Sequence, residues 1–360
     1  MFTFFGHPHT KKKPMKISTD KFGITPKGEQ ADIITLENEN GAYIKATSYG
    51  AKLVSVVVPD KNGNLDDVVL GYNNLDSYVN GHRFFGSNPG PFANRIKNAS
   101  FTIDGTTYQL KPNDGDNLLH SGNSALEAVV WGYELENDSV KFSYTCADGQ
   151  FGFPGELKVS ITYKWNNEGK LTIDYEAATS KPTHVNLTHH SYFNLGGDGN
   201  ETALDHIVKI SGSYYLETDA NLVPTGNLIP VANTPLDLRE GKLIGDVIFS
   251  DYAPMVKALG FDHCYVIDRE NEGLQHCAHV FHPKTGRTMD VYTTMPGLQL
   301  YTDNHDNGEL VGKKGKKYPM RSAICLEPQF YPNTPNIETF PSTLLRPNKE
   351  YRQTIVYQFN

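Results

Sequence analysis

The 360-residue chain lacks long apolar runs and the short motifs that mark common cofactor sites. No stretch approaches the ~20 consecutive apolar residues that a transmembrane helix requires. The sequence also lacks the Gly-rich loops of nucleoside-triphosphate and dinucleotide sites, the Gly-x-Ser-x-Gly turn of serine hydrolases, and any Cys-x-x-Cys pair. These absences predict a site without a cofactor in a protein that is not embedded in a membrane.

Cysteine and net positive charge are also scarce. The four cysteines are scattered, and a chain of this length does not need disulfides to hold its core, so we expect a reducing, cytoplasmic setting. The first 16 residues place their aromatic side chains before their charges, which is the wrong order for a secretory signal. Lys and Arg total 33 against 41 Asp and Glu, and the resulting charge of -8 repels nucleic-acid phosphates and anionic lipid. Neither nucleic acid nor a membrane surface is therefore a predicted partner.

Apolar and polar residues alternate with a period of two far more often than they follow helical spacing. Residues 157–165 show this alternation, and residues 171–175 repeat it after an Asn-Asn-Glu-Gly turn, which predicts a β-hairpin. Similar runs lie at 101–110, 140–146 and 351–359. The 32 Gly and 21 Pro residues suit many turns and few long helices. We expect an all-β protein built from large antiparallel sheets packed face to face.

No linker, charge block or repeat divides the chain. We expect residues 1–30 to form a loose N-terminal segment, with the basic stretch at 11–14 as a solvated tail. Residues 31–360 are expected to form a single β-sandwich domain whose C-terminal strand belongs to a sheet.

Two adjacent histidines, His189 and His190, lie in an aromatic segment that reads His-Val-Asn-Leu-Thr-His-His-Ser-Tyr-Phe-Asn-Leu. Because successive side chains of a strand point to opposite faces, we expect only one of the two to enter a cleft. Spacing alone leaves open whether that histidine is catalytic or has a structural role.

Glu327 is a carboxylate flanked by apolar residues near the end of a predicted strand. Full burial of such a group without a partner is costly. A partly desolvated pocket raises the pKa of a carboxyl group toward working pH and makes it a better proton acceptor. A general base and a salt-bridge partner are both compatible with this position.

Further polar residues stand at Asn94-Arg95, His120 and Asp262. Taken singly, each has an ordinary explanation, since the arginine suits an ion pair, the histidine a loop and the aspartate a turn. These segments gain meaning only as a set and in their order along the chain.

Two further patterns raise other possibilities. His276, His279 and His282 are spaced by threes, but residues three apart in a strand face opposite sides, so we predict no metal site there. The loop at 312–317 carries four lysines. It is expected to be a solvated hairpin tip, although it would attract a phosphorylated sugar if it folded over a cleft.

The full set of segments resembles the galactose mutarotase (aldose 1-epimerase) family over nearly the whole chain from about Ile33 onward. The family motifs are Asn-Arg-Ile, Leu-Leu-His-Gly-Gly, Asn-Leu-Thr-Asn-His-Ser-Tyr-Phe-Asn-Leu, Phe-Asp-His and Cys-Leu-Glu-Pro-Gln. Their counterparts here are 94–96, 118–122, 186–195, 261–263 and 325–329.

The resemblance implies a β-sandwich of the mutarotase type that binds a free aldose such as galactose or glucose. Such an enzyme interconverts the α and β anomers by ring opening and reclosure, and needs no metal or nucleotide cofactor. The resemblance further implies that Glu327 takes the proton of the C1 hydroxyl while His190 donates one to the ring oxygen. The sugar-binding residues that it implies are Asn94, Arg95, His120, Asp262 and Gln299.

The chain departs from the family pattern at several positions beside the expected pocket. Pro91 stands where Arg is usual, Ser121 replaces the first Gly of Leu-His-Gly-Gly, and His189 stands where Asn is commoner; residues 123–127 also lack the usual Gly-Phe-Asp stretch. These departures bear on sugar preference and efficiency. Two alternatives are an epimerase of a phosphorylated hexose and a noncatalytic sugar-binding module on the same fold. In each case we expect a monomer or a homodimer.

Overall fold

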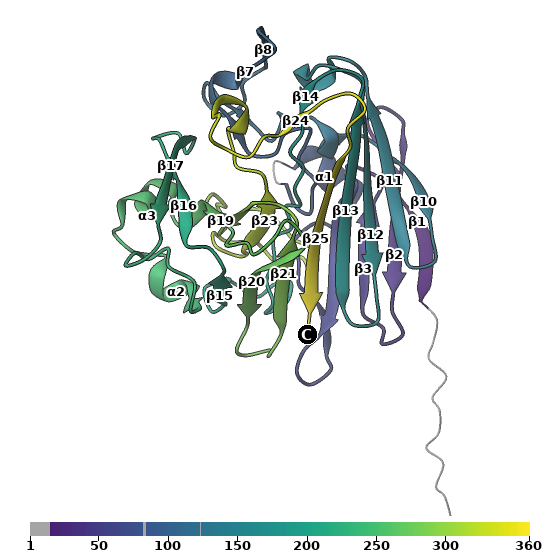
Figure 1. The fold of residues 1–360 in the computed structure, drawn as a ribbon. Coiled ribbons are helices and arrows are strands. Elements are labelled where there is room, and N and C mark those ends of the chain that lie inside the picture. Colours follow the sequence, from purple (N-terminus) through teal and green to yellow (C-terminus); the bar gives the residue numbers. More distant parts are fainter. Residues whose placement is uncertain (1–14, 82–83, 123) are drawn as a thin grey trace, which may run out of the picture.

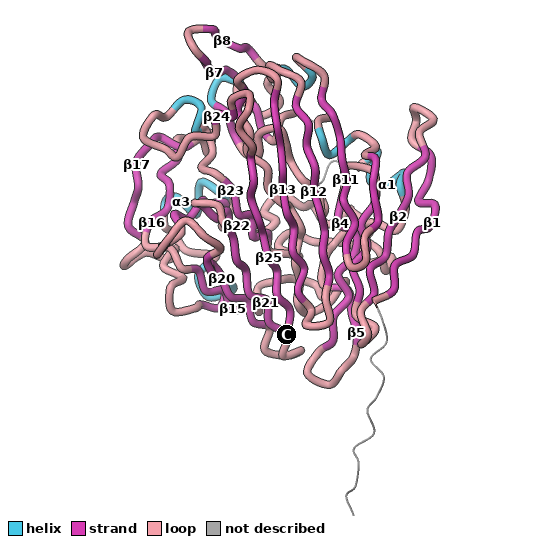
Figure 2. Tube along the Cα trace, turned by 45° about the vertical axis from the view of Figure 1, so that its right-hand side comes forward, coloured by secondary structure: helices cyan, strands magenta, loops and turns pink. Residues whose placement is uncertain are grey.

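A computed structural model describes residues 15–81, 84–122 and 124–360 of the chain (Figure 1). Strands dominate the described residues, and every pairing between named strands is antiparallel, which confirms the all-β prediction. Three large sheets form the body of the protein (Figures 1 and 2).

The largest sheet has nine strands, and its long members lie side by side in Figure 2. In spatial order they are β10 (Gly132–Leu135), β11 (Ser139–Cys146), β12 (Leu157–Trp165), β13 (Lys170–Thr179), β25 (Tyr351–Phe359), β21 (Thr288–Thr293), β20 (Gln275–Phe281), β15 (Ile207–Ile210) and β18 (Lys242–Leu243). The predicted hairpin is confirmed, because β12 pairs with β13 from Leu157↔Thr179 to Trp165↔Leu171.

Two five-stranded sheets complete the body. The first contains β1 (Lys16–Ile24), β2 (Gln30–Glu37), β3 (Tyr43–Thr47), β4 (Lys52–Pro59) and β5 (Leu65–Asp67). The second contains β17 (Pro224–Pro230), β16 (Tyr214–Thr218), β19 (Asp262–Val266), β22 (Gly297–Tyr301) and β23 (Cys325–Gln329).

The remaining elements are short. Three strand pairs are β6 (Arg95–Ile96) with β9 (Leu118–Leu119), β7 (Ser100–Ile103) with β8 (Thr106–Gln109), and β14 (Thr183–His184) with β24 (Leu344–Leu345). The helices are α1 (Leu75–Asn80), α2 (Ile244–Val247) and α3 (Ala253–Ala258), with 3-10 turns at Lys97–Ala99, Leu126–Ala128, Gln150–Gly152 and Thr334–Asn336. Within the described ranges, no helix has the length and apolar character needed to cross a membrane.

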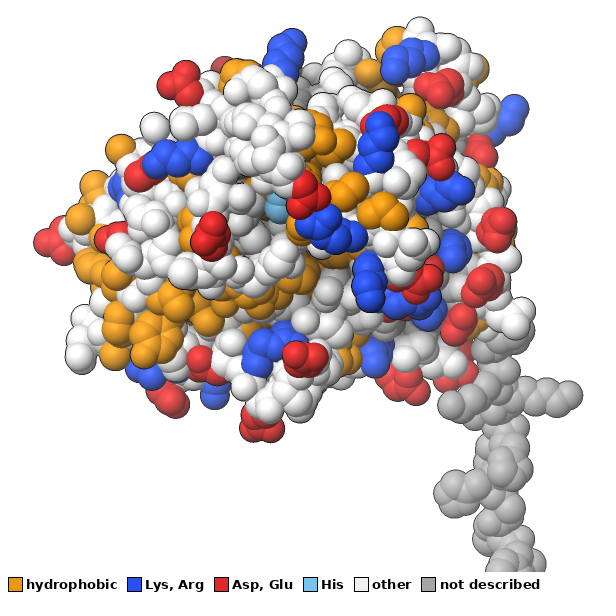
Figure 3. All heavy atoms as spheres, turned by 45° about the horizontal axis from the view of Figure 1, so that its top comes forward, with side chains coloured by type: hydrophobic (Ala, Val, Ile, Leu, Met, Phe, Trp, Pro, Cys, Tyr) orange, Lys and Arg blue, Asp and Glu red, His pale blue; other side chains and the backbone are white. Residues whose placement is uncertain are grey.

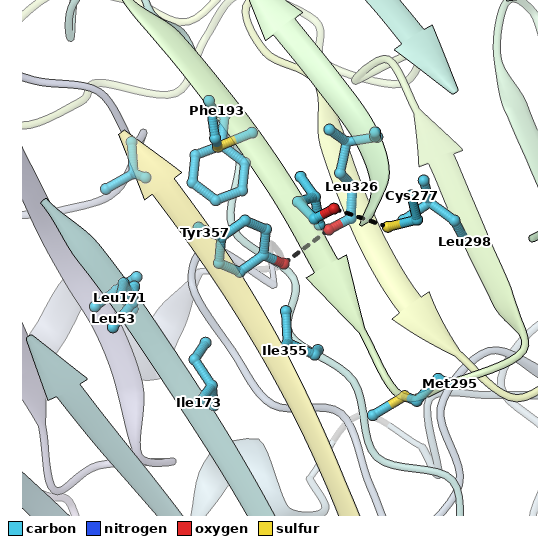
Figure 4. Close-up of a cluster of buried hydrophobic side chains, with 14 of the residues drawn as sticks. Leu53, Leu171, Ile173, Phe193, Cys277, Met295, Leu298, Leu326, Ile355 and Tyr357 are labelled. Atoms are coloured by element: carbon cyan, nitrogen blue, oxygen red, sulfur yellow. Dashed lines mark hydrogen bonds between the residues drawn. The ribbon is translucent and has the colours of Figure 1, made fainter. Parts of the chain in front are cut away.

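One hydrophobic cluster draws its side chains from the nine-stranded sheet and from both five-stranded sheets. The Tyr163 hydroxyl on β12 donates to the carbonyl of Ala51, 2.8 Å away, beside the first five-stranded sheet. The Tyr357 hydroxyl on β25 donates to the carbonyl of Leu326 on β23 at 2.8 Å, next to Phe193 (Figure 4). Large aromatic side chains are thus buried with their hydroxyl groups hydrogen-bonded, as a stable sandwich interior requires.

The N-terminal part of the described chain differs from the expected loose segment over residues 1–30. Residues 1–14 lie outside the described residues, whereas Lys16–Ile24 form β1, which pairs with β2 along its length. Most side chains of β1 are exposed, so its sequence shows little of the apolar alternation that reveals a buried strand. Backbone hydrogen bonds to β2 order this stretch, and the expectation is wrong there for that reason.

Gly86 lies between two other backbone segments. Its carbonyl accepts from the N–H of Leu53 at 2.8 Å, and its N–H donates to the carbonyl of His190 at 3.0 Å. Its φ is +63°, and a methyl group on its Cα would lie 1.8 Å from the Leu53 oxygen. We therefore expect Gly86→Ala to lower the free energy of unfolding by about 3 kcal/mol or more, as urea unfolding would measure.

Gly105→Ala is the matched control, because Gly105 also has a positive φ, +82°, but nothing lies within 4 Å of the added methyl. It should cost only about 1 kcal/mol from backbone strain. Equal losses in the two variants would show that the close approach at Gly86 is not what disfavours a side chain.

Candidate active site

A cavity of about 130 Å³ opens beside β22 and β23. Its lining residues are Phe84, Asn94, Arg95, Leu119, His120, His190, Tyr192, Asp262, Tyr301, His305 and Glu327. Every predicted site residue except Gln299 is among them. Segments far apart in the sequence thus bring the predicted polar residues to one place.

Glu327 and His190 meet at the buried end of this cavity. Glu327 lies on β23. The backbone carbonyl of His190 accepts a hydrogen bond from the N–H of Gly86. The Nε2 atom of His190 lies 3.5 Å from Oε1 of Glu327, and the two side chains are only 6% and 2% exposed. Oε2 of Glu327 and Nδ1 of His190 have no hydrogen-bond partner among the described residues. Both groups are therefore placed to contact one small polar molecule.

Burial shifts the proton affinities of this pair in opposite directions. Desolvation raises the pKa of Glu327 well above its usual range; the charge of Asp262 adds to the effect and that of Arg95 opposes it. Desolvation lowers the pKa of His190 to about 3, and the charge of Lys52 acts in the same direction. Both shifts favour the uncharged forms, a protonated carboxyl and a neutral imidazole.

His120 presents a hydrogen-bond donor to the cavity. Its Nδ1 accepts the backbone N–H of Asn94 at 3.1 Å, which assigns the proton of the neutral ring to Nε2. Burial, with the charges of His190 and Arg95, lowers the pKa of His120 well below its usual value. A neutral ring of fixed tautomer is suited to donate to a sugar oxygen.

The residue after His120 is one of the departures from the family pattern, and the structure accommodates it. Ser121 has a φ of +62°, a conformation that glycine adopts more easily. Its hydroxyl donates to the carbonyl of Phe92 at 3.0 Å and accepts the N–H of the same residue at 2.8 Å. These two bonds tie the His120 turn to the segment that leads to Asn94 and Arg95.

Arg95 and Asp262 line another wall of the cavity, and Asp114 and Gln299 contact them from outside the lining. Nε of Arg95 donates to Asp114 at 2.8 Å, and Nη1 of Arg95 lies 3.8 Å from Asp262. Nε2 of Gln299 donates to Oδ1 of Asp262 at 2.5 Å. Gln299 thus lies behind Asp262 and outside the cavity lining. The contact of Asp114 with Arg95 was not predicted, because the only local signal at this position is a turn-like Asn-Asp-Gly triplet.

Aromatic rings form the remaining wall. Phe84 lies 4.8 Å from the ring of His120 and 6.0 Å from that of His190, while Tyr192 stacks on His190 at 5.0 Å with an angle of 19° between the rings. Such rings can pack against the C–H face of a sugar. Neither Phe84 nor His305 stands in a recognisable sequence motif, so neither was predicted as a site residue.

His189 confirms that only one of the two adjacent histidines enters the cavity. It is fully buried, with Nδ1 3.2 Å from Oδ1 of Asn88 and Nε2 2.7 Å from the hydroxyl of Ser191. Its ring lies near Tyr163 and Tyr357 in the sandwich interior. His189 is therefore a core histidine with satisfied nitrogens.

His276, His279 and His282 follow only in part the expectation that residues three apart in a strand face opposite sides. A β-bulge in β20 after His276 turns His276 and His279 to the same side, where their rings lie 2.8 and 2.9 Å from one oxygen of Asp290. The expectation of opposite faces is wrong for these two residues because the bulge inserts an extra residue. His282 lies elsewhere, 3.1 Å from Asp205.

Three cavity residues also have the composition of a metal site. One ligand atom each from His120, His190 and Glu327 lie within 4.8 Å of one another. A histidine nitrogen ligates a metal through its lone pair. Because the Asn94 N–H occupies the lone pair of Nδ1 on His120, its other nitrogen carries a proton. This tautomer fits hydrogen bonding to a hydroxyl group better than metal ligation.

Lysines of the loop at 312–317 contact neighbouring segments of the protein and do not line the cavity. The side chain of Lys313 is only 6% exposed and donates to Asp67 at 2.6 Å, so the expectation of a solvated tip is wrong for this residue. Lys314 pairs with Asp66, and Lys316 donates to the carbonyl of Gly199. No lysine of the described chain lines the cavity. On the face in Figure 3, cationic and anionic side chains are interspersed. The described residues that line the cavity therefore do not include the cationic cluster that a phosphorylated hexose requires.

Comparison with known proteins gives consistent matches. The family model described as aldose 1-epimerase matches residues 32–358. A galactose mutarotase of Sus scrofa is 39% identical over 96% of this chain and 99% of its own, and an aldose 1-epimerase of Escherichia coli is 32% identical over 93% and 97%. The solved galactose 1-epimerase of Lactobacillus acidophilus has a TM-score of 0.84 at 28% identity, covering 96% of this chain and 99% of its own.

Proposed function

The chain belongs to the aldose 1-epimerase family, and we propose that it interconverts the α and β anomers of a free aldose with Glu327 and His190 as the proton-transfer pair. The observation that carries this proposal is the 3.5 Å approach of the two groups at the buried end of the cavity. The cavity, about 130 Å³, is well below the size of pockets for drug-sized ligands and suits one monosaccharide.

The reaction needs one proton acceptor and one proton donor. The Glu327 carboxylate accepts the proton of the C1 hydroxyl while the His190 imidazolium donates a proton to the ring oxygen. The bond between C1 and the ring oxygen breaks, which gives an open-chain aldehyde. Rotation about the C1–C2 bond followed by reclosure on the other carbonyl face, with the roles of the two residues reversed, gives the other anomer.

The total protonation of the pair is the same before and after ring opening. The closed-ring complex has an ionised carboxylate and an imidazolium, and opening converts them to a neutral carboxyl and a neutral imidazole. Burial favours the neutral forms of both groups, as the opposite pKa shifts of Glu327 and His190 show. The pocket therefore favours the proton transfers that open the ring.

The other cavity residues orient the sugar. Asn94, Arg95, His120 and Asp262 offer donors and acceptors to its hydroxyl groups, and Gln299 fixes the orientation of the Asp262 carboxylate from behind. The aromatic wall covers the C–H face of the ring. Precise orientation matters because proton transfer requires hydrogen-bond distances to both reacting oxygens.

Polarimetry tests the proposal directly. Freshly dissolved α-galactose or α-glucose should relax to equilibrium faster with the protein than in buffer, and the added rate should saturate with sugar. Relaxation at the buffer rate would overturn the proposal. If calorimetry then showed sugar binding, the protein would be the noncatalytic module; if only a phosphorylated hexose responded, that alternative substrate would be supported.

The pH dependence provides a second test. Burial lowers the pKa of His190 to about 3 and raises the pKa of Glu327 well above its usual range, so His190 does not titrate at the pH of an ordinary histidine. After subtraction of the buffer rate, kcat/KM should thus stay level from pH 7 down to about pH 5, where an ordinary histidine would titrate. A fall centred near pH 6.5 would contradict this assignment.

We also propose a cytoplasmic enzyme that acts as a monomer or homodimer on a monosaccharide. None of the four cysteines forms a disulfide and all four are buried, which suits a reducing compartment. Gel filtration with light scattering would measure the assembly, and a mass above that of a dimer would contradict this expectation.

A further inference from the structure

His305 is the one exposed residue among those that line the cavity and that the structure describes. Glu327, His190 and His120 are each no more than 6% exposed. The cavity thus has a closed end at the proton-transfer pair and a mouth at His305. A sugar whose anomeric atoms contact Glu327 and His190 would extend from the buried residues toward this exposed imidazole.

The two residues beside His305 in the sequence, Asn304 and Asp306, are both buried. Asn304 is fully buried, and its side-chain amide donates to the carbonyls of Ala258 at 2.9 Å and Phe261 at 2.8 Å. Its backbone N–H donates to the hydroxyl of Tyr301 at 3.0 Å. Asp306, on the other side, is 2% exposed. The backbone at 304–306 is therefore anchored, and only the His305 side chain turns outward.

The imidazole also has a defined neighbour at the mouth. The rings of His305 and Tyr301 lie 6.4 Å apart with an angle of 23° between them. Tyr301 lines the same cavity. Together the two rings extend the aromatic wall from the buried end of the cavity to its rim, and His305 adds nitrogen atoms that can donate to or accept from a hydroxyl group.

The shape of a pyranose decides which hydroxyl His305 meets. C1 and the ring oxygen must face Glu327 and His190, and C4 lies across the ring from C1, so C4 points to the mouth. Galactose and glucose differ only at C4. The C4 hydroxyl points along the C1-to-C4 direction in glucose and sideways from it in galactose, so a single side chain at the mouth, such as His305, cannot contact both hydroxyl groups equally.

We propose that His305 is a specificity-determining residue that hydrogen-bonds the axial C4 hydroxyl and makes the enzyme prefer galactose to glucose. The inference rests on the proposed function of the cavity and extends it to the choice of sugar. His305 acts on binding, not on proton transfer, because it lies at the exposed part of the cavity lining whereas Glu327 and His190 are buried.

The test compares kcat and KM for galactose and glucose in wild type and His305→Ala. Loss of one solvent-exposed hydrogen bond should lower kcat/KM for galactose about two- to tenfold, mainly through KM, and leave glucose within about twofold. His305→Gln, which keeps a donor and an acceptor, should recover most of the galactose value. His276→Ala removes another exposed histidine, away from the cavity, and should change neither sugar.

A sugar without the C4 hydroxyl closes the cycle. The rate for 4-deoxygalactose should not respond to His305→Ala, since the contact is already missing. An unchanged galactose-to-glucose ratio, or an equal response of 4-deoxygalactose, would overturn the proposal. A wild-type protein that accelerates neither sugar would instead overturn the proposed function, so the two failures are distinguishable.

Discussion

Glu327→Gln is expected to lower kcat for anomer interconversion by about 10²- to 10⁴-fold, the usual contribution of a general base. Glutamine has the shape of glutamate but no site that accepts a proton from the C1 hydroxyl. Water is a poor substitute because the Glu327 side chain is 2% exposed at the closed end of the cavity. Polarimetry with saturating galactose measures the loss.

The same variant should fold normally. Burial favours the protonated, uncharged carboxyl at this position, and an uncharged amide of the same size replaces it without a new buried charge. Urea unfolding should therefore give a free energy within about 1 kcal/mol of wild type. A folded variant with an unchanged rate would show that another group is the base.

His190→Asn is expected to lower kcat by about 10²-fold or more, because the ring oxygen loses its proton donor. The variant also loses the ring stacking on Tyr192, so some loss of stability is expected as well. Thermal unfolding measured beside the rate separates the two effects, since a stability loss alone does not reduce kcat of the folded fraction.

His189→Asn is the matched control for this change. The two histidines are adjacent and both buried, but His189 faces Asn88 and Ser191 in the interior and does not line the cavity. Its replacement should leave kcat within a fewfold of wild type, whatever it costs in stability. Equal losses of kcat in the two variants would refute the assignment of His190 as the proton donor.

Much of the fold is predictable from the period-two alternation. The hairpin of β12 and β13 was predictable because buried positions alternate with polar ones on both sides of an Asn-Gly-rich turn. β1 was not, because an exposed strand buries few side chains and leaves no apolar pattern. The bulge in β20 was also not predicted from the sequence. Its one extra residue reverses which face the following side chains point to, so strict alternation gave the wrong faces for His276 and His279.

The site divides in a similar way. Glu327, His190 and His120 stand in distinctive local segments, so the resemblance to a family could identify them. Phe84 and His305 reach the cavity only through the arrangement of loops, and local sequence does not encode which loop side chain faces a common space. Gln299 differs from these two residues, because it was predicted to bind the sugar but does not line the cavity. Its contact with Asp262 is visible only in the structure.

The position of β1 bears on how this protein behaves at high concentration. Among the described strands β1 has a single neighbour, β2, so its outer side presents backbone donors and acceptors to which another molecule's strand can add. Lys16, Asp20 and Lys21 place charges along that edge, and the register shifts between Lys21 and Gly23. Charges and bulges of this kind discourage edge-to-edge aggregation, so we expect this strand to resist pairing with the same edge of a neighbouring molecule at high concentration.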